Sequence, residues 1–149
     1  MDKERIMELN TYITFGGQCE AAFRFYERVL GGKITTMLTH ANGPTAKHVP
    51  NDWQTKVMHA RLQFGDRSLM GSDAPPSHYK PAQGFHVQIG VSDPAEADRI
   101  YSALAANGKE TMSIQETFWA TRFGMLVDQF GIPWMINCDK AINRENVAA

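Results

Sequence analysis

Hydrophobic and polar positions follow one pattern along the first half of the chain and repeat it along the second. Apolar residues alternate with polar ones in Leu9–Phe15 and then recur at helical spacing in Glu20–Leu30. An alternation of two residues predicts a strand, and a recurrence every three or four residues predicts a helix. Phe85–Val91 and Ala95–Ala105 show the same two periods in the same order. The pattern therefore predicts two copies of a strand-then-helix unit.

Three further strand-like segments follow each predicted helix, which completes a βαβββ order in both halves. They are Lys33–Thr39, Lys56–Phe64 and Arg67–Ser72 in the first half, and Lys109–Gln115, Trp119–Asp128 and Pro133–Cys138 in the second. The sequence predicts an α+β protein whose repeats span about residues 8–74 and 84–139, joined by a linker at about 75–83. A chain of 149 residues suits a single domain of this kind.

The two halves also match residue by residue along their predicted helices. Arg24 and Tyr26 recur as Arg99 and Tyr101 at a constant shift of 75 residues. Self-similarity of this kind marks a repeat architecture, and two units are too few for an extended solenoid. We therefore expect the two modules to pair face to face around a shared cavity.

One stretch, residues 40–55, has no counterpart in the second half. It contains two prolines, Pro44 and Pro50, and a tryptophan, Trp53. Long ordered loops in compact domains are often lids or interface elements. We expect Trp53 to be exposed there, where its ring would cover a ligand or anchor a partner chain.

The alternating strands each divide into an apolar face and a polar face. The polar sets are His59, Arg61 and Gln63 within Val57–Phe64, and His86, Gln88 and Gly90 within Phe85–Val91. Successive side chains of a strand point to opposite faces, so the apolar sets are expected to pack under the helices. The polar sets face either solvent or the wall of a polar cavity, and alternation alone does not choose between these.

Composition and charge narrow the classes of partner. Hydrophobic residues make up 43% of the chain, charged residues make up 21%, and the formal net charge is −1. This balance is ordinary for a globular domain and gives no footprint for nucleic acid or an anionic membrane. No apolar run approaches the roughly 20 residues of a membrane span, and the start, Met1–Arg5, is charged. We expect a cytoplasmic protein whose two cysteines, Cys19 and Cys138, are reduced.

Several segments together resemble a known superfamily. They are Thr14–Tyr26, Phe25–Gly32, Met58–Leu62, Leu69–Pro76, Phe118–Gly124 and Val127–Gly131. Over about residues 8–140 the chain is similar to the vicinal oxygen chelate superfamily, which includes glyoxalase I, bleomycin-resistance proteins, fosfomycin-resistance enzymes and extradiol dioxygenases. Within that superfamily it resembles the PhnB-like subgroup. The resemblance implies a glyoxalase-like, cup-shaped mixed sheet with its helices outside, completed in a homodimer.

Catalytic members of that superfamily hold a divalent metal at four positions, on the first and last strand of each module. The resemblance and the repeat place these positions at Thr11, Met70, His86 and Met135. Only His86 is of the expected ligand type, because Thr and Met side chains bind such cations poorly. A slip of one residue in the first strand would place Asn10 or Tyr12 there instead of Thr11, and neither completes a metal site. We therefore expect no metal cofactor, and a divalent metal completed by other ligands is the alternative.

The resulting interpretation is a protein that binds a small organic molecule in the cup without a standard divalent metal site. The candidate ligand-binding residues are His59, Arg61, Gln88, Trp119, Met70, Met135 and Trp53. His86 is the candidate catalytic residue, because a histidine titrates near neutral pH and can act as a general base. The alternative function is that of a metal-dependent lyase, isomerase or dioxygenase of the glyoxalase type that uses His86.

Overall fold

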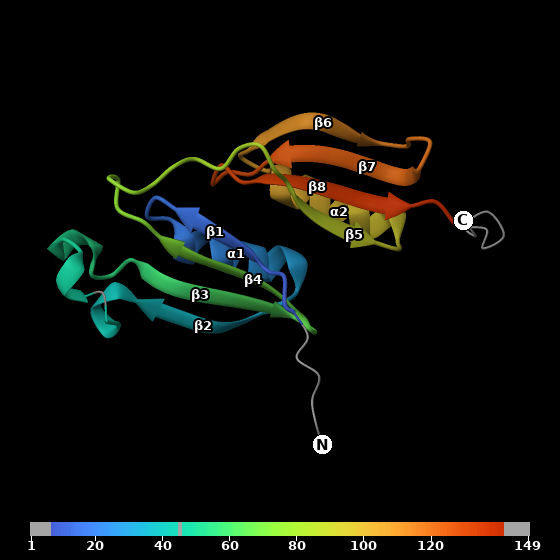
Figure 1. The fold of residues 1–149 in the computed structure, drawn as a ribbon. Helices are drawn as coiled ribbons and strands as arrows, with labels where there is room; N and C mark the ends of the chain where they lie inside the picture. Colours follow the sequence, from blue (N-terminus) through green and yellow to red (C-terminus); the bar gives the residue numbers. More distant parts are fainter. Residues whose placement is uncertain (1–6, 45, 142–149) are drawn as a thin grey trace, which may run out of the picture. The chain divides into compact units, whose positions relative to one another are not determined.

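The computed structural model describes residues 7–44 and 46–141, and the order of elements is βαβββ in each half (Figure 1). In the first half the elements are β1 (Thr11–Phe15), α1 (Cys19–Leu30), β2 (Lys33–Thr39), β3 (Val57–Phe64) and β4 (Arg67–Asp73). In the second half they are β5 (Val87–Val91), α2 (Pro94–Ala105), β6 (Lys109–Gln115), β7 (Ala120–Val127) and β8 (Pro133–Asp139). The predicted α+β fold of two βαβββ modules is confirmed.

The chain divides into two compact units, Met1–Lys80 (unit 1) and Pro81–Ala149 (unit 2). Each unit contains one mixed sheet, with strand order β1-β4-β3-β2 in unit 1 and β5-β8-β7-β6 in unit 2. The first and last strands of each module are parallel neighbours, and all other neighbours are antiparallel. Because the two sheets share order and direction, a strand position in one unit has an equivalent in the other.

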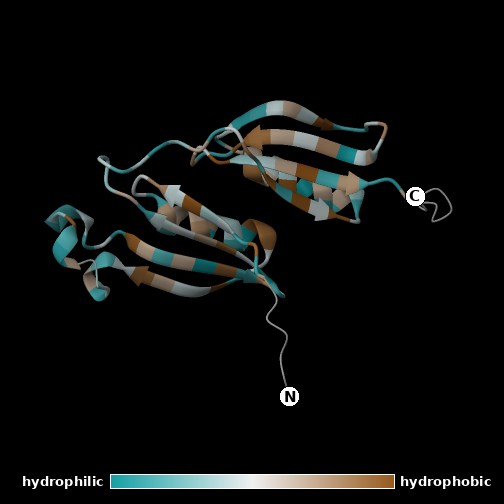
Figure 2. Cartoon of the chain, viewed as in Figure 1, coloured by the Kyte–Doolittle hydropathy of each residue, from teal (hydrophilic) through white to brown (hydrophobic). Residues whose placement is uncertain are grey.

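One helix packs on each sheet. Helix α1 contacts β2, β3 and β4, and helix α2 contacts all four strands of its own sheet. Apolar and polar residues alternate in bands along the strands (Figure 2). The helix residues that face the sheets are buried, namely Ala22, Phe23, Tyr26 and Val29 in α1 and Ala97, Ile100, Tyr101 and Leu104 in α2. Each large apolar side chain buried in this way stabilises the fold by about 1.5–3 kcal/mol. Among the described residues, no helix is long and apolar enough to cross a membrane.

The N-terminus of α1 is capped by a residue that is distant in sequence. Gln18, which precedes the helix, makes no side-chain capping hydrogen bond. Asp73, at the end of β4, takes this role: its Oδ1 accepts hydrogen bonds from the backbone N–H groups of Gly17 and Cys19, each at 2.9 Å. Its Oδ2 accepts from the N–H of Val57 at 2.9 Å. One buried carboxylate therefore holds both the start of α1 and the start of β3.

Helix α2 carries a local cap instead. The Asp93 carboxylate accepts a hydrogen bond from the Ala95 N–H at 3.0 Å, and Pro94 occupies the first turn. Pro is favoured there because its missing N–H would have no partner within the helix. The helix therefore begins at Pro94, one residue before the range Ala95–Ala105 in which the sequence shows helical spacing.

The turn between β7 and β8 is organised by another buried carboxylate. Asp128 Oδ1 accepts from the backbone N–H groups of Phe130 at 2.8 Å and Ile132 at 3.0 Å. Its Oδ2 accepts from the indole Nε1–H of Trp134 at 2.8 Å. Asp128 is 3% exposed, so these bonds satisfy donors that water does not reach.

Strands β1 and β5 begin two residues later than predicted. Their parallel ladders with β4 and β8 start at Thr11 and Val87. Leu9 and Phe85, two residues earlier, are 94% and 42% exposed. Alternation predicts where a chain can be extended, whereas the ladder starts only where a partner strand lies beside it. His86 therefore lies immediately before β5 and not within it.

The segment 40–55 forms three short 3₁₀ turns, which are His40–Asn42, Ala46–His48 and Asn51–Trp53. The expected exposure of Trp53 is wrong, because its side chain is only 9% exposed. The Trp53 ring lies beside Gly17, so the segment packs against the turn between β1 and α1. Trp53 therefore contributes to the core of unit 1.

Candidate functional site

The face of each sheet opposite the helix, which we call the open face, carries side chains that the core does not use. On unit 1, four cross-strand neighbours in direct register cross the whole sheet. They are Thr36 on β2, Arg61 on β3, Met70 on β4 and Tyr12 on β1, and we call them the arginine row. Residues in register point to the same face, and all four are half-buried or exposed.

His59 extends the arginine row along β3. Its Nδ1 is hydrogen-bonded to the Tyr12 hydroxyl at 3.1 Å, and the two rings are stacked with centroids 5.7 Å apart. The Arg61 Nη2 group donates to Met70 Sδ at 3.5 Å. A thioether is a weak acceptor, and a guanidinium carries five N–H donors. This contact therefore leaves most of the guanidinium's hydrogen-bonding capacity for a ligand.

The open face of unit 2 has an equivalent row with different chemistry. It consists of Met112 on β6, Met125 on β7, Met135 on β8 and Gln88 on β5, and we call it the methionine row. Methionine side chains are flexible and polarizable, so they adapt to irregular apolar shapes. The methionine row is therefore an adaptable apolar surface that ends in one amide.

An aromatic group lies next to the methionine row. The indole Nε1–H of Trp119 donates to Asn137 Oδ1 at 3.2 Å, and Asn137 is the cross-strand partner of Phe123. The Trp119 ring makes edge contacts with Phe118 and Phe123, with centroid distances of 4.8 and 5.2 Å. Trp119 is 43% exposed. An indole held by its N–H and open on one side can stack on a planar ligand.

The expected position of Thr11 is corrected by one residue. Thr11 shares its side of β1 with Ile13 and Phe15, which are buried against the helix. Tyr12 is the residue that pairs with Met70 on the open face. A register change of one residue moves a side chain to the opposite face of a sheet, so Thr11 lies outside the candidate site.

The expected position of His86 is also displaced. His86 is exposed and precedes β5, and Gln88, two residues later, is the partner of Met135 in the parallel ladder. The structure therefore gives Gln88 the place on the first strand that the sequence analysis assigned to His86. The role of His86 as a general base stays a prediction.

The side chains at these four places do not fit a hard divalent cation. They offer the phenol of Tyr12, the thioethers of Met70 and Met135, and the amide of Gln88. Zinc and iron(II) are held by several imidazole, carboxylate or thiolate ligands, and magnesium and manganese are held by carboxylate and carbonyl oxygens together with water. Within residues 7–44 and 46–141, no group of three or more His, Cys, Asp or Glu side chains could hold a metal ion.

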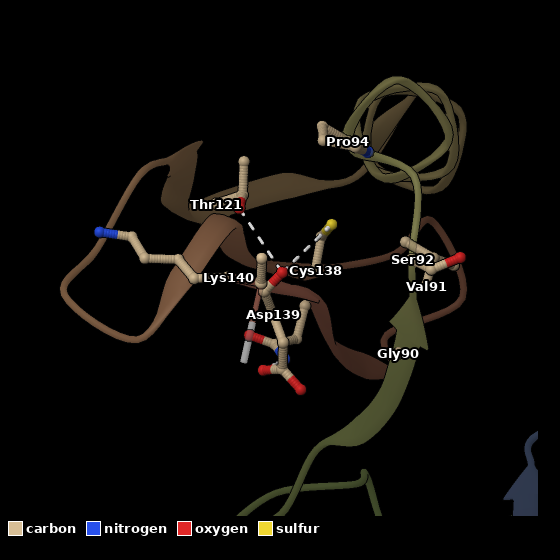
Figure 3. Close-up of a pocket in the computed structure, with 10 residues that line it drawn as sticks. Gly90, Val91, Ser92, Pro94, Thr121, Cys138, Asp139 and Lys140 are labelled. Carbon is tan, nitrogen blue, oxygen red and sulfur yellow. Dashed lines mark hydrogen bonds between the residues drawn. The ribbon is translucent and has the colours of Figure 1, made fainter. Parts of the chain in front are cut away.

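Unit 2 also contains a pocket of about 580 Å³ at the carboxyl ends of β5 and β8 (Figure 3). Its lining consists of Gly90, Val91, Ser92, Pro94, Thr121, Asn137, Cys138, Asp139, Lys140 and Ala141. Several of these polar groups already have partners: Asn137 Nδ2 donates to Asp139 Oδ1 at 2.8 Å, and Lys140 pairs with Glu116 at 3.1 Å.

In unit 1 the corresponding end of the sheet is covered. The ammonium of Lys56 donates to the Gly17 carbonyl at 3.1 Å, and the Trp53 ring lies alongside. The pocket in unit 2 is therefore an uncovered strand end, and the open faces are the stronger candidates for a ligand site.

Two groups with raised pKa values lie outside the open faces. Burial, with the Glu110 carboxylate nearby, raises the pKa of Tyr101 to about 12. The Tyr101 hydroxyl donates to the carbonyls of Met112 and Met125, at 2.9 and 3.2 Å. Burial raises the pKa of the Cys19 thiol, and the Asp73 and Glu20 carboxylates raise it further. Both groups are held protonated, which suits structural roles and not nucleophilic ones.

Sequence reasoning placed Arg61, His59, Met70, Met135, Gln88 and Trp119 on or beside the open faces, but it missed their neighbours. The residues missed are Thr36, Met112, Met125 and Asn137. Their membership depends on which strands are adjacent and in which register. Alternation within a single strand carries no such information.

The chain is similar to a known protein family and to several known proteins over most of its length. A model of the Glyoxalase/Bleomycin resistance protein/Dioxygenase superfamily matches residues 8–136. Protein YjdN of Escherichia coli (strain K12) is 37% identical over 142 residues, which cover 90% of this chain and 97% of that protein. The crystal structure of protein PA1353 from Pseudomonas aeruginosa matches with a TM-score of 0.84 and 39% identity, over 91% of this chain and 100% of that chain. A Bacillus cereus PhnB protein, described as a putative 3-demethylubiquinone-9 3-methyltransferase, matches with a TM-score of 0.71 over 89% of this chain and 99% of that chain; at 23% identity it supports the fold alone.

Proposed function

Because the chain belongs to the Glyoxalase/Bleomycin resistance protein/Dioxygenase superfamily, we propose that it binds a small organic molecule on the open faces of its sheets, without a standard divalent metal site. The observation that carries this proposal is that the arginine row and the methionine row occupy equivalent positions on the two sheets. Their side chains are absent from the cores of the two units, yet they combine a cation, a phenol, an amide and thioethers. Ligand sites typically consist of apolar lining with a few placed polar groups.

The metal-dependent alternative has weaker support. A lyase, isomerase or dioxygenase of the glyoxalase type would need several hard donors, and the rows supply mainly thioethers and hydroxyls. His86 lies outside the ladder of β5, so it would have to be joined by ligands outside the rows. The two functions make opposite predictions about the effect of a chelator.

A screen of small organic compounds in the presence of EDTA is expected to find a ligand that raises the melting temperature. At a ligand concentration of about 100 times Kd, the stabilisation is about 2.7 kcal/mol. Acrylamide quenching locates the ligand, because Trp119 is 43% exposed whereas Trp53 and Trp134 are 9% and 1% exposed. A ligand on the open face of unit 2 is expected to protect Trp119 from the quencher.

Two variants sharpen this test. Trp119→Ala is expected to weaken binding by up to about tenfold, the worth of a good aromatic contact, whereas Leu9→Ala, at an exposed position before β1, is expected to have no effect. Stabilisation that requires added manganese, zinc or nickel, and that disappears with EDTA and in His86→Ala, would contradict the proposal. That result would support the glyoxalase-type alternative.

The homodimer and the cytoplasmic location stay predictions of the sequence analysis. Light scattering on the purified protein is expected to give twice the mass of one chain. A monomer across the micromolar range would contradict the dimer and would leave the ligand proposal intact, because each row lies within one unit.

A further inference from the structure

We propose that the open face of unit 1 binds the oxyanion group, a carboxylate or a phosphate, of an organic ligand, and that Arg61 is the residue that holds it. This inference rests on the proposed function and adds the chemical class of the ligand. Arginine suits the task, because its planar guanidinium pairs with two oxygens of a carboxylate or phosphate at once.

The charge distribution of the sheet supports an anion. Within the four strands of unit 1, the only acidic residue is Asp73. Asp73 is 4% exposed, and its carboxylate accepts hydrogen bonds from three backbone N–H groups. Lys33 is the first residue of β2 and the cross-strand neighbour of Gln63, so it adds a second cation on the same face as Arg61. The open face of unit 1 is therefore cationic, and no carboxylate of its own strands neutralises it.

The partners of Arg61 differ from those of the other arginines in the described part of the chain. Four of these form ion pairs, which are Arg24–Glu20, Arg67–Asp66, Arg99–Glu96 and Arg122–Asp98. Arg28 is exposed at the end of α1. Arg61 is half-buried and contacts a thioether, and among the described residues no carboxylate pairs with it. A half-buried guanidinium that contacts a thioether keeps most of its five N–H donors for an anionic ligand.

The fold itself does not require an arginine at this place. The equivalent position in unit 2 is Met125 on β7. Its cross-strand neighbours are Met112 on β6 and Met135 on β8, which correspond to the neighbours of Arg61 on β2 and β4. A methionine therefore satisfies the packing of this site in one copy of the module. The packing therefore leaves the charge of Arg61 without a structural role. Tyr12, which lies two strands away in the same row and is 47% exposed, offers an aromatic surface for the organic part of the ligand.

Binding of three probes with a common aromatic ring tests the inference. Phenylacetate carries a carboxylate, phenyl phosphate carries a phosphate, and 2-phenylethanol is neutral. The titrations use the full chain at constant ionic strength and follow backbone amide shifts by NMR. We expect at least one anion to bind more tightly than the alcohol and to shift amides of β3 and β4. The anion that binds more tightly then shows whether the oxyanion group of the ligand is a carboxylate or a phosphate.

Three variants assign the effect to one residue. Arg61→Met copies the residue of unit 2 and is expected to weaken anion binding by about 10- to 100-fold, the worth of a charge-assisted bidentate contact. Arg61→Lys keeps the charge without the bidentate geometry and is expected to give an intermediate loss. Arg67→Met removes an arginine of the same sheet whose side chain is 88% exposed, and it is expected to bind like the wild type.

The outcomes separate the inference from the function on which it rests. Equal losses in Arg61→Met and Arg67→Met would show a general charge effect and overturn the inference. Binding of the alcohol as tightly as the anions would overturn it as well, while leaving the proposed function in place. If no probe binds and the wider compound screen also finds no ligand, both fail.

Discussion

Replacing Asp73 with alanine is expected to lower the free energy of unfolding by about 3–5 kcal/mol, because a buried donor left without an acceptor costs about 1–3 kcal/mol. The change removes the acceptor of three backbone N–H groups, those of Gly17, Cys19 and Val57. These groups lie at the start of α1 and the start of β3, where no other side chain caps the helix. A loss of this size is a large part of the roughly 5–15 kcal/mol that stabilises a typical domain.

Urea unfolding followed by circular dichroism measures this loss, and two variants control it. Asp73→Asn keeps one carbonyl oxygen but turns an amide N–H₂ toward a backbone N–H, so we expect a smaller loss of about 1–3 kcal/mol. Asp66→Ala removes a carboxylate from the β3–β4 turn that is 97% exposed, and its effect is expected within about 0.5 kcal/mol. If Asp73→Ala were as stable as Asp66→Ala, the long-range cap would not be needed.

Replacing Asp128 with alanine is expected to have a comparable effect on unit 2, about 3–5 kcal/mol. The Asp128 carboxylate accepts hydrogen bonds from the N–H groups of Phe130 and Ile132 and from the indole of Trp134. Trp134 is 1% exposed, so water cannot replace the lost acceptor without opening the core. The variant should also shift the fluorescence emission of Trp134.

Gln129→Ala is the matched control for this second prediction, since Gln129 is exposed in the same turn. It is expected to leave both the unfolding midpoint and the emission spectrum unchanged. Similar midpoints for Asp128→Ala and Gln129→Ala would mean that the turn is held by its backbone bonds alone. These include the bond from the Gly131 N–H to the Asp128 carbonyl at 2.9 Å.

Most of the fold can be predicted from periodicity. The bounds of β2 and β6 agree with the prediction, and α2 begins at Pro94 behind its Asp93 cap. These elements have strong local signals, namely β-branched runs, glycine stops and a capping residue. The long-range cap of α1 by Asp73 could not be predicted, because it depends on which strand lies beside the helix start.

The register of the candidate site shows where an internal repeat misleads. The helices match at a shift of 75 residues, as Tyr26 and Tyr101 do. The first strands match at 76, because Tyr12 and Gln88 are the partners of Met70 and Met135. The connection from strand to helix is one residue longer in the first half. One residue is enough to exchange the two faces of a strand, so the shift of 75 residues matched His86 with Thr11, which lies on the helix side of β1. His86 itself was misplaced for a different reason, because β5 begins only at Val87.

Equivalent positions of the two modules differ in how often they carry the same residue. Where the helix covers the sheet, both copies often keep the same residue, as in the pairs Ala22 and Ala97, Tyr26 and Tyr101, Ile13 and Ile89, and Leu62 and Leu126. On the uncovered side the copies differ in three of four places, which are Thr36 and Met112, Arg61 and Met125, and Tyr12 and Gln88. Packing constrains the first set and leaves the second free. After a duplication, the uncovered side of one copy can acquire new chemistry while the other copy keeps its own.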